Sequence, residues 1–84
     1  MPKCYGFLLL PRYSLLDLAG ALAVLRQANQ LLGGRAIDTL LLSRDGRPVT
    51  AAGGEQLLIS QGLNGAVMSI DGLFIISDAP PQAS

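Results

Sequence analysis

The chain has 84 residues, half of them hydrophobic and only 14% charged, and its six basic and six acidic residues give a formal net charge of zero. Nucleic-acid-binding surfaces need clustered lysine and arginine, so the equal number of basic and acidic residues argues against such a surface in this chain. A chain this short buries only about 60% of its unfolded surface when it folds alone. The apolar excess therefore indicates that some of the surface is covered by a second copy or by the remainder of the same domain.

The chain contains no histidine and a single cysteine, Cys4. This composition removes the usual zinc, haem and redox signatures, and we expect no cofactor and no metal. One cysteine cannot form an internal disulfide, which favours a reducing cytoplasm. The apolar run after Lys3 is too short for a signal peptide and is interrupted by Pro11, Arg12 and Asp17. No apolar run approaches the roughly 18 residues that a membrane span requires.

The first half of the chain predicts a strand followed by a helix. Residues 3–10 are apolar with little alternation, which is typical of a parallel strand buried on both faces, and Pro11 ends it. Residues 14–32 carry leucines and alanines at the three-four spacing of one helical face, and further apolar residues widen that face. Gly33 and Gly34 provide the stop, since glycine tolerates the left-handed conformation that closes helices.

The second half predicts shorter strands separated by turns. The expected elements are a strand at 37–44, a turn at 45–48, a returning strand at 49–52, a short strand at 56–60, a loop with at most one helical turn at 61–69, and a last apolar strand at 72–77. The Pro-rich tail 80–84 is expected to be a linker or a truncated end. A helix between parallel strands indicates an α/β fold. Because no second long helix follows, we expect one face of the sheet to be bare.

The turn after the first strand holds the candidate ligand-binding residues Arg12, Tyr13 and Asp17. Open α/β sheets bind ligands at the carboxyl ends of their strands, where Arg12 and Tyr13 would lie. A solvated turn is the alternative for these two. For Asp17 the alternative is a capping box, in which Ser14 accepts from the amide of Asp17 and the acid reaches back to the amide of Ser14. The cap is the favoured reading, and the two roles can coexist.

Two further features, the small residues of the helix and Cys4, carry their own hypotheses. The helix combines leucines with small residues, which would let a second helix approach closely. We therefore expect a homodimer contact there, involving Leu15, Ala19, Leu22 and Ala23. Cys4 lies in an apolar strand without a neighbouring histidine, so it is expected to behave as a small hydrophobe rather than as a reactive thiol.

Three segments in order carry a family resemblance: GFLLLPRYSLLDLAGALAVLRQANQLLG, LLSRDGRPVTAAGG and DGLFII. They resemble the beginning of the class I glutamine amidotransferase-like domain of the ThiJ/PfpI superfamily, in the version found at the N-terminus of AraC-type transcriptional regulators. The resemblance implies a partial flavodoxin-like three-layer α/β sandwich, with parallel strands, one main helix and a hairpin excursion. Residues 1–79 would form the first portion of that domain.

The resemblance also bears on single residues. Asp17 matches the acid of the first strand-to-helix loop, which in enzymatic members lies close to a catalytic cysteine. The proline and glutamate usual in that helix are here Ala21 and Ala23, and the glycine pair expected after the last strand is replaced by the sequence Ser77-Asp78-Ala79. The cysteine elbow of the family would lie beyond Ser84, and Cys4 does not match it.

We therefore expect a non-catalytic, ligand-sensing and dimerising portion of an AraC-type regulator, which contacts DNA only through a helix-turn-helix domain outside this sequence. Two alternatives stay open. One is a fragment of a cysteine-dependent amidase, peptidase or glyoxalase-like hydrolase of the same superfamily. The other is a stand-alone dimerising scaffold. Without histidine, no nucleophile and base can be paired within these residues.

Overall fold

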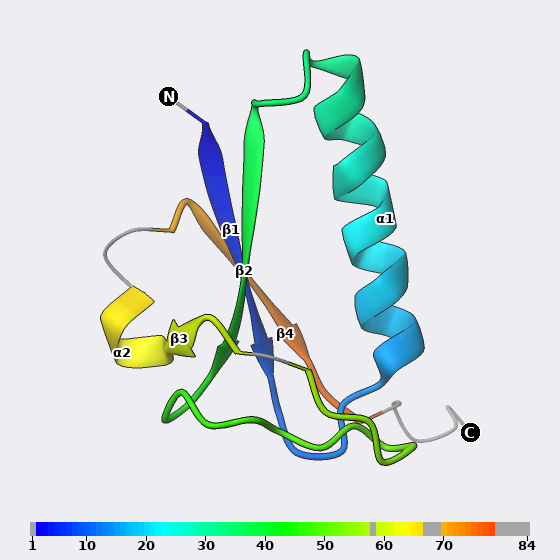
Figure 1. Cartoon of the computed structure of the whole chain (residues 1–84), viewed down its shortest axis with the longest axis vertical. Helices are drawn as coiled ribbons and strands as arrows, with labels where there is room; N and C mark the ends of the chain where they lie inside the picture. The colour runs from blue at the N-terminus through cyan, green and yellow to red at the C-terminus, as the bar shows by residue number, and fades with distance from the viewer. Residues whose placement is uncertain (1, 58, 67–69, 79–84) are drawn as a thin grey trace, which may run out of the picture.

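A computed structural model of the chain describes residues 2–57, 59–66 and 70–78. Within these residues, four strands and two helices follow one another in the order β1 (Lys3–Leu9), α1 (Leu15–Leu31), β2 (Ile37–Ser43), β3 (Gln61–Gly62), α2 (Leu63–Ala66) and β4 (Gly72–Ile76) (Figure 1). The strands form one parallel sheet in the order β3-β2-β1-β4. The α/β class and the parallel sheet expected from the sequence are thus confirmed.

Strand β1 lies in the middle of the sheet because its apolar residues can be buried on both faces. Its central residues are covered, with Phe7 and Leu9 packed on the α1 side and Leu8 on the opposite side. In register, Phe7 pairs with Leu41 of β2 and with Phe74 of β4. The rings of Phe7 and Phe74 stack with centroids 4.9 Å apart.

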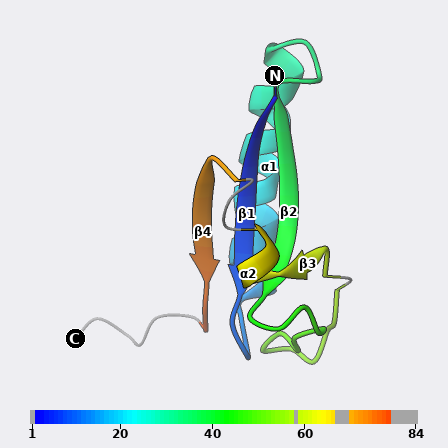
Figure 2. The same cartoon turned by 90° about the vertical axis from the view of Figure 1, so that its left-hand side faces the viewer.

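Helices α1 and α2 lie on opposite faces of the sheet, with α1 behind the strands and α2 in front of them in Figure 2. On the α1 face, Leu18 of the helix joins the buried residues of β1 and β4. On the other face, Leu63 and Ile70 pack against Leu8 and Leu42. The sequence predicted a wholly bare face, but this face is bare only along β4, where Leu73 and Ile75 are exposed.

The segment between β2 and β3 differs from the sequence expectation. Residues 49–52 and 56–60 are predicted as strands from the sequence, yet their described residues, which exclude residue 58, contribute only isolated bridges, Tyr13 with Ala51 and Thr50 with Gln56. The segment between β2 and β3 forms a loop, the excursion loop, which is hydrogen-bonded to the β1–α1 turn. Ala52 N–H donates to the Tyr13 carbonyl at 2.9 Å. In the loop predicted at 61–69, the expected turn of helix is present as α2, whereas the two-residue strand β3 was not predicted. The last three residues of this segment lie outside the described part.

Helix α1 begins and ends where the sequence predicts, to within one residue. Ser14 is its N-cap, and Gly33 and Gly34 follow it with φ values of 98° and 87°, which only glycine adopts without strain. The Asn29 side chain then guides the chain into β2. Its Oδ1 accepts from the amides of Ala36 and Ile37 at 2.8 and 2.9 Å, and its Nδ2 donates to the Gly34 carbonyl at 3.2 Å.

We expect Asn29→Ala to lower the free energy of unfolding by about 1–3 kcal/mol, because it leaves two partly buried amides without their acceptor. The neighbouring Gln30 is exposed, so Gln30→Ala should stay within about 0.5 kcal/mol of the parent chain. Urea unfolding followed by circular dichroism measures both. Equal stability of the two variants would contradict the role given to Asn29.

Candidate functional site

The strand order places a reversal point between β1 and β4. From β1 the chain moves outward to β2 on one side, whereas β4 returns to the other side of β1. In open α/β sheets, ligands bind beyond the carboxyl ends of the strands near such a point. The β1–α1 turn, residues 10–14, and the end of β4 meet there, at the lower edge of the sheet in Figure 1.

Backbone hydrogen bonds hold this turn on both sides. Toward β4, Leu10 N–H donates to the Ile76 carbonyl at 3.0 Å, and Ser14 N–H donates to the Ser77 carbonyl at 2.9 Å. Toward the excursion loop, Arg12 N–H donates to the Thr50 carbonyl at 2.8 Å. Hydrogen bonds to β4 on one side and to the excursion loop on the other therefore hold this turn in place, although it has no regular secondary structure.

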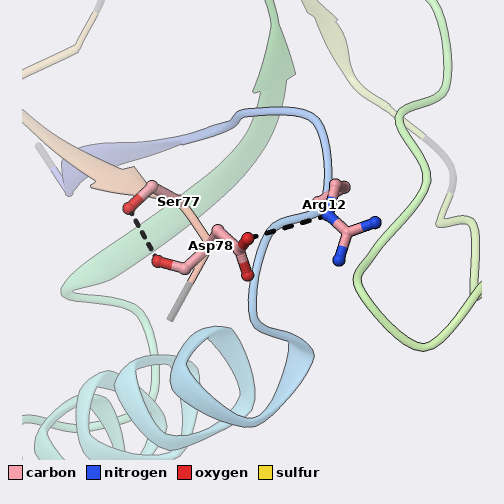
Figure 3. Close-up of polar contacts among 3 residues, drawn as sticks. All are labelled: Arg12, Ser77 and Asp78. Carbon is pink, nitrogen blue, oxygen red and sulfur yellow. Dashed lines mark hydrogen bonds and ion pairs between the residues drawn. The ribbon is translucent and has the colours of Figure 1, made fainter. Parts of the chain in front are cut away.

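Arg12 is the strained residue of this turn. Its φ is 64°, the only positive value at a non-glycine position among the described residues. Such left-handed backbone is costly for a residue with a Cβ and tends to occur at functional sites. The Arg12 side chain extends into solvent and lies 3.7 Å from the Asp78 carboxylate (Figure 3). Both groups are largely exposed, so this ion pair contributes little stability.

Tyr13 turns the other way and is fully buried in the core beneath α1. The prediction that it lines an open cleft is therefore wrong, as is the alternative of a solvated position. Its phenol oxygen has no hydrogen-bond partner among the described residues. Burial, and secondarily the charge of Glu55, raises the pKa of the Tyr13 phenol above its ordinary value.

Ser14 and Asp17 form only one of the two hydrogen bonds of the predicted capping box. The Asp17 amide donates to Ser14 Oγ at 3.2 Å, as expected for an N-cap. The reciprocal bond is not formed, because the Ser14 amide donates to Ser77 instead. The Asp17 carboxylate remains exposed in the first turn, where the helix dipole favours a negative charge. Of the three predicted ligand residues, Arg12 and Asp17 thus present their side chains to solvent, while Tyr13 does not.

A cleft of about 460 Å³ opens beside Arg12, between the carboxyl ends of β1 and β2. Its lining consists of residues 9–12, 43–45 and 47–50. The floor is apolar and the rim carries three arginines, Arg12, Arg44 and Arg47, against one acid, Asp45. Arg47 lies 3.9 Å from that acid, and both side chains are exposed.

The residues on the β2 side of this cleft were not predicted from the sequence. Ser43 ends β2 and is buried, and its hydroxyl lacks a partner within the described residues. A polar residue that directly follows a buried apolar strand marks the carboxyl edge of a parallel sheet, so Ser43 and Arg44 could have been found by that signal.

Cys4 lies far along β1 from this edge, at the amino end of the strand, and is half-buried. The Cys4 backbone is hydrogen-bonded to Asp71, whose carboxylate accepts from the Cys4 amide at 2.8 Å. Burial raises the pKa of the Cys4 thiol, and the charges of Asp38 and Asp71 raise it further. A thiol with a raised pKa is less often a thiolate, which agrees with the expectation of an unreactive cysteine.

Comparison with known proteins finds transcriptional regulators. No family model matches the chain. Over 65 residues the chain is 43% identical to the HTH-type transcriptional regulator GbdR of Pseudomonas aeruginosa, in strains UCBPP-PA14 and PAO1, covering 77% of this chain and 18% of the regulator. The crystal structure of an AraC family transcriptional regulator from Pseudomonas putida superposes with a TM-score of 0.81 at 28% identity, covering 98% of this chain and 44% of that one.

The chain is thus homologous to part of an HTH-type regulator and shares the fold of part of an AraC family regulator. It spans about a fifth of the first relative's length and less than half of the second. Neither match bears on the ThiJ/PfpI superfamily, which stays a prediction.

The strain at Arg12 predicts an unusual order of stabilities. Arg12→Gly should be more stable than Arg12→Ala by about 1 kcal/mol, because glycine adopts a positive φ freely and alanine does not. Both variants lose the same ion pair, so the difference isolates the backbone term. Urea unfolding of the two measures it.

Arg47 offers the matched control, since it also pairs with an aspartate but has no positive φ. There the order should reverse, with Arg47→Ala the more stable variant. If the alanine variant were more stable to unfolding than the glycine variant at both positions, Arg12 would carry no backbone strain in solution.

Proposed function

We propose that this chain is the ligand-sensing, non-catalytic portion of an AraC-type transcriptional regulator. The observation that supports it most is the match to two regulators, in sequence over most of the chain and in fold over nearly all of it. The chain's zero net charge agrees with DNA contacts made elsewhere in such a regulator. A regulator of this kind acts in the cytoplasm, and its sensing portion would be the opening of a ThiJ/PfpI-type domain.

The ligand site we propose is the cleft between the carboxyl ends of β1 and β2. Its volume suits a small molecule, and apolar walls with a few polar groups are typical of ligand pockets. The arginine excess at the rim favours an anionic group on the ligand. Because the ion pairs of Arg12 and Arg47 are long and exposed, a carboxylate could replace either acid at little cost.

A catalytic role is disfavoured by the positions of the reactive groups. Cys4 lies at the opposite end of β1 from the cleft, with a raised pKa, and the chain has no histidine to act as its base. None of the helices in the described part of the chain is long and apolar enough to cross a bilayer.

Nuclear magnetic resonance of the ¹⁵N-labelled chain tests this proposal with a panel of free amino acids and short-chain carboxylates. We expect at least one of these compounds to shift amides of residues 10–14 and 43–50. Arg44→Ala should weaken that response about tenfold, which corresponds to the loss of one charge-assisted contact. Arg35→Ala should leave it unchanged, because Arg35 lies in the α1–β2 loop at the other end of the sheet.

Two results would count against the proposal. Amide shifts confined to other parts of the chain, or none with any compound, would remove the sensing role and favour the scaffold alternative. Hydrolysis of p-nitrophenyl acetate that disappears in Asp17→Ala would instead favour the hydrolase alternative.

A further inference from the structure

The hydroxyl of Ser43 is a polar group that the fold buries without giving it a partner. Ser43 is the last residue of β2 and is 1% exposed, and its Oγ has no hydrogen-bond partner among the described residues. A hydroxyl that is taken out of water without a partner lowers the stability of the fold, whereas an alanine methyl in its place would not. Such groups are rare in native proteins, so this one calls for an explanation.

The cleft between the carboxyl ends of β1 and β2 supplies that explanation, because Ser43 lies in its wall. The other hydroxyl of the lining belongs to Thr50, which is exposed and already accepts from Gln56 Nε2 at 2.8 Å. The remaining side chains of the lining are apolar or charged. Ser43 is therefore the one neutral side chain of the lining with its hydrogen-bonding capacity unspent.

The Ser43 oxygen is covered, but the wall around it is not rigidly closed. Leu10 and Val49 line the same cleft and are only half-buried, so their side chains have room to rotate. Rotamer changes of this kind are common when a ligand binds. The serine hydroxyl itself can turn among its staggered positions and can act as donor or as acceptor. A ligand seated in the cleft can therefore reach it.

The charges around the cleft restrict which group of a ligand approaches Ser43. Arg12, Arg44 and Arg47 line the cleft, and the single acid, Asp45, lies 3.9 Å from Arg47. This excess of positive charge favours a carboxylate at the rim and disfavours an ammonium group, since like charges repel. The group that reaches Ser43 is then neutral, and a hydroxyl or carbonyl oxygen can hydrogen-bond to a serine hydroxyl.

We propose that Ser43 determines the specificity of the cleft, and that the ligand is a small carboxylic acid with a second oxygen, a hydroxy acid or an oxo acid. The arginines hold the carboxylate, Ser43 binds the second oxygen, and the apolar lining packs against the carbon chain between them. This inference rests on the proposed function and narrows its class of ligand. Because the fold has already removed water from Ser43, the new bond forms without that cost and adds more affinity than a bond to an exposed group.

Nuclear magnetic resonance titrations of the ¹⁵N-labelled full chain test the inference with two pairs of acids, lactate with propionate and 3-hydroxybutyrate with butyrate. Within each pair the acids differ by one hydroxyl. Each acid is added up to about 50 mM, since ligands of this size bind weakly. In at least one pair the hydroxy acid should bind about tenfold more tightly than its partner, as expected for one well-formed hydrogen bond.

Substitutions of Ser43 should remove this preference. Ser43→Ala should reduce it to less than about twofold and leave the affinity for the acid without the hydroxyl unchanged. Ser43→Cys keeps the side-chain volume but offers only a weak donor, so it should also lose most of the preference. Ser60→Ala is the matched control, because Ser60 Oγ accepts from the Leu41 amide of the same strand at 3.3 Å but lies outside the cleft, and the preference should persist.

Urea unfolding gives a second readout, which separates a ligand-binding hydroxyl from a structural one. Ser43→Ala should keep or raise the urea midpoint, because no hydrogen bond is lost within the described residues. Ser14→Ala should lower the midpoint, because it removes the N-cap bond of α1.

Equal affinity for both acids of each pair, with amide shifts at residues 10–14 and 43–50, would overturn this inference and leave the proposed function standing. A preference that survives in Ser43→Ala would assign the recognition to another residue, and a lowered urea midpoint in that variant would assign the hydroxyl a structural role; either result overturns the inference. Absence of shifts with all four acids would overturn it too, whereas the wider panel of amino acids and carboxylates would then decide the proposed function.

Discussion

The pinning of the β1–α1 turn between β4 and the excursion loop is the interaction on which the site depends. The amides of Leu10 and Ser14 are bound to carbonyls at the end of β4, and the amide of Arg12 is bound to Thr50. These bonds fix where β1 ends, where α1 begins and how closely the excursion loop approaches. They also consume the Ser14 amide that a complete capping box would have used, so the helix start is set by tertiary structure as much as by its own cap.

The same constraint shapes the chemistry of the carboxyl edge. A turn held from two sides can keep Arg12 at a positive φ, with its guanidinium at the rim of the cleft, while the next residue, Tyr13, is buried in the core. The strain at Arg12, the arginine-rich rim and the buried Ser43 hydroxyl, which has no partner among the described residues, lie together at this edge. That concentration, together with the similarity to regulators, is why a small anionic ligand at this edge is the function we propose.

Much of the fold could be predicted from the sequence because its main elements have strong local signals. Continuous apolar runs marked β1, β2 and β4, and Ser14 with Gly33 and Gly34 marked the ends of α1. The excursion loop and β3 could not be predicted, because their backbone bonds go to distant partners such as Tyr13 and Leu42. Only half of the cleft was predicted. The end of β1 indicates Arg12, and the same end-of-strand signal indicates Ser43 and Arg44, but the local sequence does not show that these two strand ends are neighbours.

Hydrogen exchange of the backbone amides of Arg12 and Ser14 tests the pinning of the turn most directly. Both residues lie in a loop at the surface, where an unbound amide would exchange at nearly the random-coil rate. We expect exchange of both amides to be slowed by about a hundredfold or more, to within roughly tenfold of the amides inside β1, because the turn opens only when its neighbours do. Exchange within about tenfold of the random-coil rate at both positions would show that the turn is not held, and the cleft beside it would lose its structural basis.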